Sequence, residues 1–236
     1  SGITHPAPGN HEWYDSPSGA GYFDYFDGVF QNRGRAGPRG KGFYSTNLTH
    51  RWHLITLNSN CTKDDPPLSI TAAVPCYRGS AQERWLRHDL ATHRHMCVIA
   101  QWHHPYFTSG GDAAARNDRA TRSFWNDLYK AGATLVLNGH DHGYERFASQ
   151  TPSGKLDRKH GLREFVVGTG GKSLFGNSHK SAPHSQVYRD TAFGVTLFTL
   201  RPHGYSWAFH SEPVAGNPAF SDHGSGACAT PRRSHH

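Results

Sequence analysis

Residues 96–105 read MCVIAQWHHP and residues 134–146 read TLVLNGHDHGYER, and in both stretches a short apolar run ends in histidines. A run of about five apolar residues is typical of a strand that is buried on both faces. In open α/β sheets, ligands gather at the carboxyl ends of such strands. The two stretches therefore predict an α/β fold in which polar loops meet at one end of a sheet.

The rest of the chain alternates helix and strand patterns. Residues 80–93 predict a helix because Ser80 and Glu83 form a capping box, and residues 119–132 predict a second helix that Gly132 ends. Further strands are predicted at residues 52–58, 163–168, 193–200 and 205–210. Strands that alternate with helices and are followed by a strand-rich tail indicate an α/β sandwich with mixed sheets.

The composition limits the classes of function. The chain has 236 residues, of which 35% are apolar and 12% aromatic, and its formal net charge is +7. This length fits one α/β domain, and the aromatic content is too high for a disordered chain. The positive charge favours phosphorylated substrates. The one dense basic cluster, residues 31–42, contains no aromatic residue, so a solvated loop is a better interpretation than a nucleic-acid patch.

Other global features concern the compartment. No apolar run approaches the roughly 20 residues that span a bilayer, so we expect no membrane contact. Cys61 and Cys76 bracket a Pro-rich loop, and we predict a disulfide between them that stabilises the fold by about 3 kcal/mol, although two buried free thiols are the alternative. A disulfide predicts a secreted, extracellular protein. Cys97 is expected to be buried in a strand and not to pair with Cys228.

Three polar clusters carry the candidate chemistry. They are GNHE at residues 9–12, HHP at residues 103–105 and NGHDHGYER at residues 138–146. Imidazole suits zinc, iron and manganese, whereas calcium and magnesium prefer oxygen ligands. Each cluster alone is a weak signal, because a chain with 19 histidines contains such strings by chance. Their common place after strands favours a shared metal site.

In this order the three motifs resemble those of the calcineurin-like metallophosphoesterases, in particular the purple acid phosphatases and related secreted bacterial phosphatases. The resemblance rests on GNHE, HxP and GHxHxYER, and the tail also looks like the bacterial branch. It implies one metallophosphoesterase domain over residues 1–236. The implied fold class is α/β, a four-layer α/β/β/α sandwich with mixed sheets that lacks its first strands.

The resemblance also implies the metal ligands. Asn10, His103 and His140 would bind one ion, and His142 would bind the other. The cofactors would be two divalent or trivalent ions, iron, zinc or manganese, and a metal-bound hydroxide would attack the phosphorus. The implied reaction is hydrolysis of a phosphoric monoester or diester, with a phosphorylated small molecule as substrate.

Three neighbouring side chains receive other roles by the same resemblance. His11 would be catalytic, binding the phosphate or protonating the leaving group, and would not be a metal ligand. Glu12 could orient His11 from the second shell, and an exposed loop glutamate is an equal alternative. His104 is expected to bond locally.

The chain also departs from the family pattern. The Asp-x-His motif does not occur, and the single Gly-Asp, Gly111-Asp112, falls after the second cluster and does not match the motif whose aspartate bridges both ions. We therefore expect that an upstream segment with these two motifs is missing. Little hydrolysis by these 236 residues alone and an exposed apolar sheet edge would follow.

Two competing interpretations were weighed. The metallo-β-lactamase fold requires HxHxDH, and HDHGYE at residues 140–145 lacks the trailing Asp-His, so that class is excluded. The second is a non-catalytic or fragmentary domain of the same fold that binds phosphate or a partner. The absence of the bridging aspartate favours it.

Overall fold

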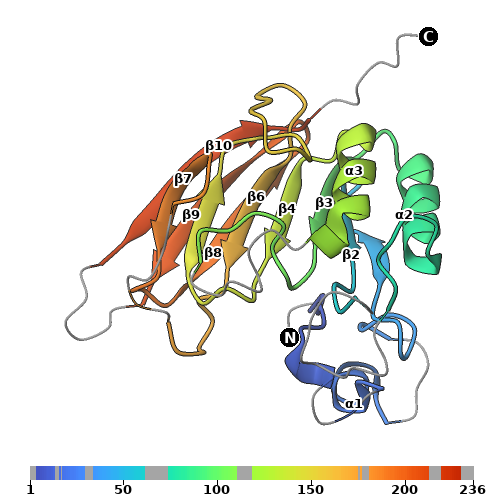
Figure 1. The fold of residues 1–236 in the computed structure, drawn as a ribbon. Helices are drawn as coiled ribbons and strands as arrows, with labels where there is room; N and C mark the ends of the chain where they lie inside the picture. The colour runs from blue at the N-terminus through green and yellow to red at the C-terminus, as the bar shows by residue number, and fades with distance from the viewer. Residues whose placement is uncertain are drawn as a thin grey trace.

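The computed structural model describes residues 4–13, 16, 18–29, 34–61, 74–110, 119–174, 176, 181–212 and 219–229. In these residues the chain forms two sheets that pack face to face, with helices beside the larger sheet (Figure 1). The helices are η1 (His11–Trp13), α1 (Ala20–Asp27), α2 (Ala81–Thr92), η2 (Arg119–Thr121) and α3 (Arg122–Ala131). The strands are β1 (Tyr44–Asn47), β2 (Trp52–Thr56), β3 (Cys97–Gln101), β4 (Leu135–Asn138), β5 (Tyr144–Phe147), β6 (Arg163–Val167), β7 (Ser185–Arg189), β8 (Gly194–Arg201), β9 (Gly204–Ser211) and β10 (Ser221–Ala227).

The larger sheet has seven strands in the order β1-β2-β3-β4-β6-β5-β7. Its centre, β2, β3, β4 and β6, is parallel, whereas β1 and β5 run antiparallel to their neighbours. The smaller sheet, β10-β9-β8, is antiparallel throughout. This mixed α/β architecture with two sheets is the fold class that the sequence predicts. The described residues form three layers, α/β/β, where four were expected, because none of their helices covers the outer face of the smaller sheet.

The predicted helices and their end signals are present. Glu83 N–H donates to Ser80 Oγ at 3.2 Å at the start of α2, which is half of the predicted capping box. Gly132 ends α3 in the left-handed conformation with φ of 76°, which glycine adopts without a steric cost. Residues 144–147 differ from the prediction, because they form strand β5 instead of continuing the loop after His142. The sequence analysis also did not predict α1, β1, β7 and β10.

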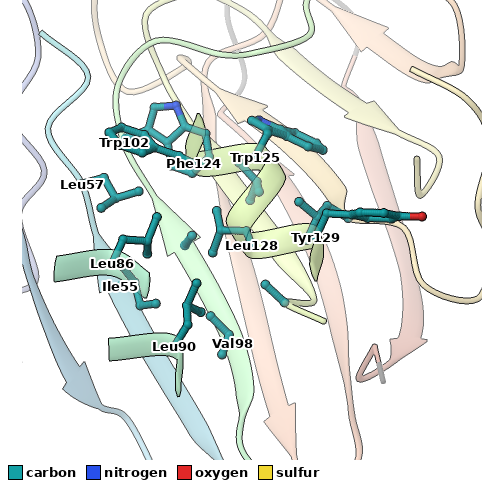
Figure 2. Close-up of a cluster of buried hydrophobic side chains, with 14 of the residues drawn as sticks. Ile55, Leu57, Leu86, Leu90, Val98, Trp102, Phe124, Trp125, Leu128 and Tyr129 are labelled. Atoms are coloured by element: carbon teal, nitrogen blue, oxygen red, sulfur yellow. The ribbon is translucent and has the colours of Figure 1, made fainter. Parts of the chain in front are cut away.

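Two apolar layers hold the elements together. Strands β2 and β3 are buried on both faces, since Leu54 and Ile99 face the smaller sheet while Ile55 and Val98 face helices α2 and α3. Figure 2 shows the helix layer, in which Leu86 and other large side chains cover the sheet. Each such side chain contributes about 1.5–3 kcal/mol when it is fully buried. The central strands and their carboxyl ends are therefore fixed in position.

The structure contains two disulfides. The predicted Cys61–Cys76 bond is present. The expectation that Cys97 stays unpaired is wrong, because Cys97 of β3 is bonded to Cys228, which directly follows β10. Packing of the two sheets brings these cysteines together across 131 residues of sequence, a proximity that no local pattern encodes. None of the described helices is long and apolar enough to cross a bilayer.

The smaller sheet has an open side. Strand β8 lies at its edge, and the side chains of Val195 and Leu197 are 64% and 60% exposed. No helix of the described residues covers this outer face (Figure 1). An edge strand with exposed apolar side chains favours association with other chains.

The N-terminal segment is anchored to the larger sheet. Gln101, the last residue of β3, donates from Nε2 to the carbonyl of His5 at 2.8 Å. The hydroxyls of Tyr22 and Tyr44 both donate to the carbonyl of Pro6, at 3.1 and 2.8 Å. These bonds place the segment that leads to Asn10 at the carboxyl end of β3.

Candidate metal centre

Three side chains from distant loops meet at the carboxyl ends of β3 and β4. His103 Nε2 lies 2.9 Å from Asn10 Oδ1 and 3.1 Å from His140 Nδ1. We call Asn10, His103 and His140 the cleft triad. The motifs predict that these three residues and His142 lie in one site; the structure brings the three together, and His142 lines the same cleft.

The donor atoms of the cleft triad fit a transition-metal ion. Two zinc–nitrogen bonds of about 2 Å span at most about 4 Å, so the two imidazole nitrogens, 3.1 Å apart, are within reach of one ion. Two imidazole nitrogens and an amide oxygen are a ligand set that zinc, iron and manganese accept. These residues could therefore hold an ion, and their chemistry agrees with the metal that the sequence predicts.

The electrostatic environment keeps the rings of His103 and His104 neutral. Burial lowers the pKa of His103 well below its usual value, and the neighbouring His104 and His140 lower it further. Burial likewise lowers the pKa of His104 to about 3, with His140 adding to the effect. Imidazole must be neutral to bind a metal. The pocket thus favours the ligating state of His103.

The backbone of His140 has a strained φ angle, and its ring lies in the triad. His140 has a φ of 61°, one of two positive φ values among the described residues other than glycine. Such a conformation costs about 1–3 kcal/mol and is concentrated at functional sites. Gly139 N–H donates to the carbonyl of His103 at 3.0 Å, which ties the two histidine loops to each other.

Two glycines are required by close packing at the site. A methyl group on Gly9 would lie 2.9 Å from Cε1 and Nδ1 of the His103 ring. A methyl group on Gly168 would lie 1.8 Å from the carbonyl oxygen of Asp141. Both glycines let the chain approach where a Cβ atom would displace a triad residue or its loop.

A polar loop that follows β2 forms hydrogen bonds with residues adjacent to the triad. Asn60 Nδ2 donates to the carbonyl of Gly9 at 2.9 Å, and Ser59 Oγ is 2.8 Å from His104 Nδ1. The Ser59 contact agrees with the local bonding expected for His104, whose ring also lies 4.5 Å from that of His140. Ser59 and Asn60 were not predicted, although they follow a buried strand, as the motifs after β3 and β4 do. The expectation that GNHE also follows a strand is wrong for the described residues, because the first of their strands, β1, begins at Tyr44.

A second supporting loop is held by buried carboxylates. Glu145 accepts hydrogen bonds from N–H and Oγ of Ser109, at 2.8 and 2.5 Å, and Glu164 accepts from the N–H groups of Tyr106 and Phe107. Burial raises the pKa of Glu145 to about 7, against the lowering effect of Ser109, and raises that of Glu164 well above its usual value. These residues fix the chain that follows His104.

The end of the GHDHGYER motif is structural. Strand β5 directs Glu145 to Ser109 and its neighbours Tyr144 and Arg146 to Asp222 of the smaller sheet. Tyr144 OH and Arg146 Nε donate to Asp222 Oδ2 at 2.6 and 2.7 Å. The motif therefore contributes one ring to the triad and fastens its own loop to both sheets.

The triad opens into a cleft of about 670 Å³. His11, Glu12, His142 and Lys172 also line it. His142 Nδ1 lies 2.8 Å from the carbonyl of Ser173, and His142 is not among the described histidines that cluster within 4.8 Å, which are His103, His104 and His140. Glu12 Oε2 accepts the N–H of Gly9 at 2.6 Å, so this carboxylate stabilises the turn that presents Asn10.

A second group of possible ligands lies apart from the cleft. His53 of β2, Asp89 of α2 and His93 at the end of α2 place one ligand atom each within 4.8 Å. His53 Nε2 is 2.7 Å from Asp89 Oδ2, and the two imidazole rings are stacked at 3.7 Å. We call these three residues the α2 cluster.

Comparison with known proteins identifies the class. The sequence pattern of the calcineurin-like phosphoesterases matches residues 3–144, which is more than half of the chain and includes the triad and His142. The chain therefore belongs to the calcineurin-like phosphoesterase family.

Individual relatives agree with this class. Purple acid phosphatase 18 of Arabidopsis thaliana is 30% identical over 122 residues, which are 50% of this chain and 28% of that protein. The purple acid phosphatase PPD1 from yellow lupin seeds has a similar fold with a TM-score of 0.63 at 16% identity, over 78% of this chain and 32% of that one. The chain thus spans about a third or less of the length of these two phosphatases.

A third protein of similar fold has a different role. GAP50, the anchor in the inner membrane complex of Plasmodium, gives a TM-score of 0.56 at 15% identity, over 81% of this chain and 55% of that one. At 15–16% identity, these TM-scores show a shared fold alone.

Proposed function

We propose that this protein is a metal-dependent phosphoester hydrolase with a dinuclear centre in the cleft. The observation that carries the proposal is the cleft triad, in which His103 Nε2 lies within 3.1 Å of both Asn10 Oδ1 and His140 Nδ1. Membership in the calcineurin-like phosphoesterase family supports it. Iron, zinc or manganese fits the two imidazoles and one amide.

In this proposal the triad holds one ion and His142 contributes to a second. Bound ions supply charge neutralisation of the phosphoryl group and a lowered pKa for water. The chain's own residues position the substrate: His11, exposed on the cleft wall, donates to a phosphoryl oxygen or gives a proton to the leaving group. Glu12 keeps the Gly9–Asn10 turn in place through its bond to Gly9 N–H.

The second ion would have fewer protein ligands than the first and would therefore bind more weakly. No stretch of this chain matches the family's Asp-x-His or bridging Gly-Asp motif, so the protein ligands proposed for the second ion reduce to His142. A single imidazole binds an ion weakly. We therefore expect these residues to bind one ion tightly and to hydrolyse phosphoesters slowly.

Metal analysis and a turnover assay test the proposal together. The purified chain is equilibrated with Mn²⁺, Zn²⁺ or Fe²⁺, its metal content is measured, and p-nitrophenyl phosphate hydrolysis is followed. Metal-dependent turnover that is lost in His103→Ala and kept in His93→Ala supports the proposal. A wild-type chain that binds none of the three metals would overturn it.

The second candidate is a non-catalytic domain that binds phosphate or a partner. The missing bridging aspartate favours it, and GAP50 has a similar fold and is described as an anchor. Tight binding of one ion and of inorganic phosphate, with no turnover of p-nitrophenyl phosphate at any metal concentration, would support this role over catalysis.

We also propose that the protein is exported to an oxidising compartment. Two disulfides, Cys61–Cys76 and Cys97–Cys228, support this, because disulfides persist mainly outside the cytosol. Peptide mapping of the protein purified from its native host, without reduction, tests it. Alkylation of Cys61 or Cys97 would contradict it.

A further inference from the structure

One wall of the cleft consists largely of glycine backbone and ends at the cationic residue Lys172. Gly168, Gly170, Gly171 and Lys172 line the cleft beside the histidines. Because three of these four residues have no side chain, the wall leaves room for a ligand. Gly171 has a φ of 141°, a conformation that favours glycine and directs the chain into Lys172.

Lys172 is available to a ligand. Its side chain is exposed, and no carboxylate of the described residues is paired with it. Of the described residues that line the cleft, Glu12 alone carries a carboxylate, and that group already accepts the N–H of Gly9. The described lining of the cleft therefore carries its positive charge at Lys172.

The position of Lys172 is fixed relative to the triad. Gly168 N–H donates to the carbonyl of Gly143 at 3.0 Å, and the carbonyl of Ser173 lies 2.8 Å from His142 Nδ1. These contacts attach the chain before and after Lys172 to the loop that carries His140 and His142. The backbone of Lys172 is thus held near the triad, and its flexible side chain can reach a substrate from there.

The size of the cleft indicates what reaches Lys172. Pockets of about 300–1,000 Å³ hold ligands the size of a drug molecule, and this cleft has about 670 Å³. A phosphoryl group alone occupies a small part of that volume. The leaving-group portion of a substrate therefore has space to extend along the glycine wall to Lys172.

We propose that Lys172 binds a second oxyanion on the leaving group, so that the substrates are small phosphoesters with two anionic groups. This inference rests on the proposed phosphoesterase function. An ammonium group is a compact, flexible cation that suits a carboxylate or a second phosphate equally well. Lys172 acts as a specificity residue and takes no part in the bond cleavage.

The test compares substrates that differ in the second anion. The kcat/KM values of 4-carboxyphenyl phosphate and of 1,4-phenylene bisphosphate are each divided by that of phenyl phosphate, with metal added. We expect K172Q to lower at least one of these ratios about fivefold, as one exposed ion pair predicts, and K172R to restore it. K155Q removes an exposed lysine elsewhere and should leave both ratios unchanged.

Equilibrium binding gives a readout that does not need turnover. The Kd of 4-carboxyphenylphosphonate relative to phenylphosphonate, measured by calorimetry, should rise in K172Q by a factor similar to the loss in the carboxylate ratio. If wild type hydrolyses phenyl phosphate while K172Q matches wild type in both ratios and in relative Kd, the role of Lys172 is wrong and the phosphoesterase function stands. If wild type neither binds the phosphonates nor cleaves any ester, both proposals fail.

Discussion

The cleft triad and the α2 cluster use the same types of side chain and differ in what faces the imidazoles. In the α2 cluster a carboxylate faces the imidazoles: His53 Nε2 is 2.7 Å from Asp89 Oδ2, and His93 Nδ1 is 3.5 Å from Asp89 Oδ1 and 2.9 Å from the Asp89 carbonyl. The other nitrogen of His53 lies 2.7 Å from Asn47 Oδ1. Every described polar contact of these rings joins a nitrogen to an oxygen of the protein.

In the cleft triad one ring nitrogen faces another. His103 Nε2 and His140 Nδ1 are 3.1 Å apart, at the floor of an open cleft, and burial lowers the pKa of His103. Two neutral imidazoles can form one N–H···N hydrogen bond, whereas a metal ion can accept a lone pair from each of the two nitrogens. The comparison teaches that the two histidine clusters differ by the presence of an internal carboxylate, which supports a structural role for the α2 cluster and the proposed metal site at the triad.

The largest expected effect separates the two groups by metal affinity. His103→Ala removes a ligand from the triad, and we expect metal affinity to fall by more than about 100-fold, since even outer partners of ligands account for 10–100-fold. His93→Ala in the α2 cluster should leave affinity unchanged. Metal titration of both variants measures this, and an equal loss in His93→Ala would abolish the distinction.

The next effect is on stability and should appear in the α2 cluster. Asp89→Asn keeps the volume but leaves buried His53 facing an amide, so we expect the free energy of unfolding to fall by about 2 kcal/mol. Ser45→Ala, which removes a single hydrogen bond to Asp89, should lower it by about 1 kcal/mol. Urea denaturation of the two variants gives these values, and metal content should stay at the wild-type level in both.

A smaller effect tests whether the backbone positions the triad. Gly168→Ala would place a methyl group 1.8 Å from the Asp141 carbonyl and shift the loop that carries His140, so we expect about a tenfold loss of metal affinity. Gly170→Ala is the matched control, because nothing lies within 4 Å of its added methyl group. If the two variants bind metal equally well, the loop is not held by this contact.

The sequence was sufficient for the central fold and for the floor of the site. Continuous apolar runs predicted β2, β3 and β4, and the motifs after β3 and β4, together with GNHE near the start of the chain, predicted the meeting of Asn10, His103 and His140. This works because a strand buried on both faces has a strong pattern, and parallel strands bring their carboxyl ends to one edge.

The parts that could not be predicted depend on tertiary contacts. Strand β10 reads SDHGSGA and has no apolar pattern, because its stability comes from pairing with β9 and from Asp222, which accepts bonds from Tyr144 and Arg146. The α2 cluster likewise joins residues 36 positions apart in sequence. His142 was expected beside the triad as a ligand of a second ion, and that role remains a proposal because its nitrogen contacts the Ser173 carbonyl.

The last expected effect is a difference in the sign of pH dependence between the two regions. Burial raises the pKa of Asp89, but hydrogen bonds from His53 and Ser45 outweigh it and hold the pKa below its usual value. Its stabilising effect is therefore present above about pH 4, the unfolded value, and is lost as the pH falls through the folded pKa. Glu145, which holds the loop beside the triad, behaves in the opposite way, because burial raises its pKa to about 7.

For Glu145 the stabilising effect is complete below about pH 4.5 and is lost as the pH rises through about 7. The free energy of unfolding of the wild type should therefore contain a term that falls by about 1 kcal/mol per pH unit between pH 5 and 7, since one group contributes at most about 1.4. Glu145→Gln should remove this slope, and Asp89→Asn should instead flatten the decline below pH 4. Urea denaturation from pH 3 to pH 8 resolves the two terms. If Glu145→Gln and Asp89→Asn changed the free energy of unfolding over the same pH range, the two carboxyls would titrate in similar environments. The two regions would then differ in metal binding alone.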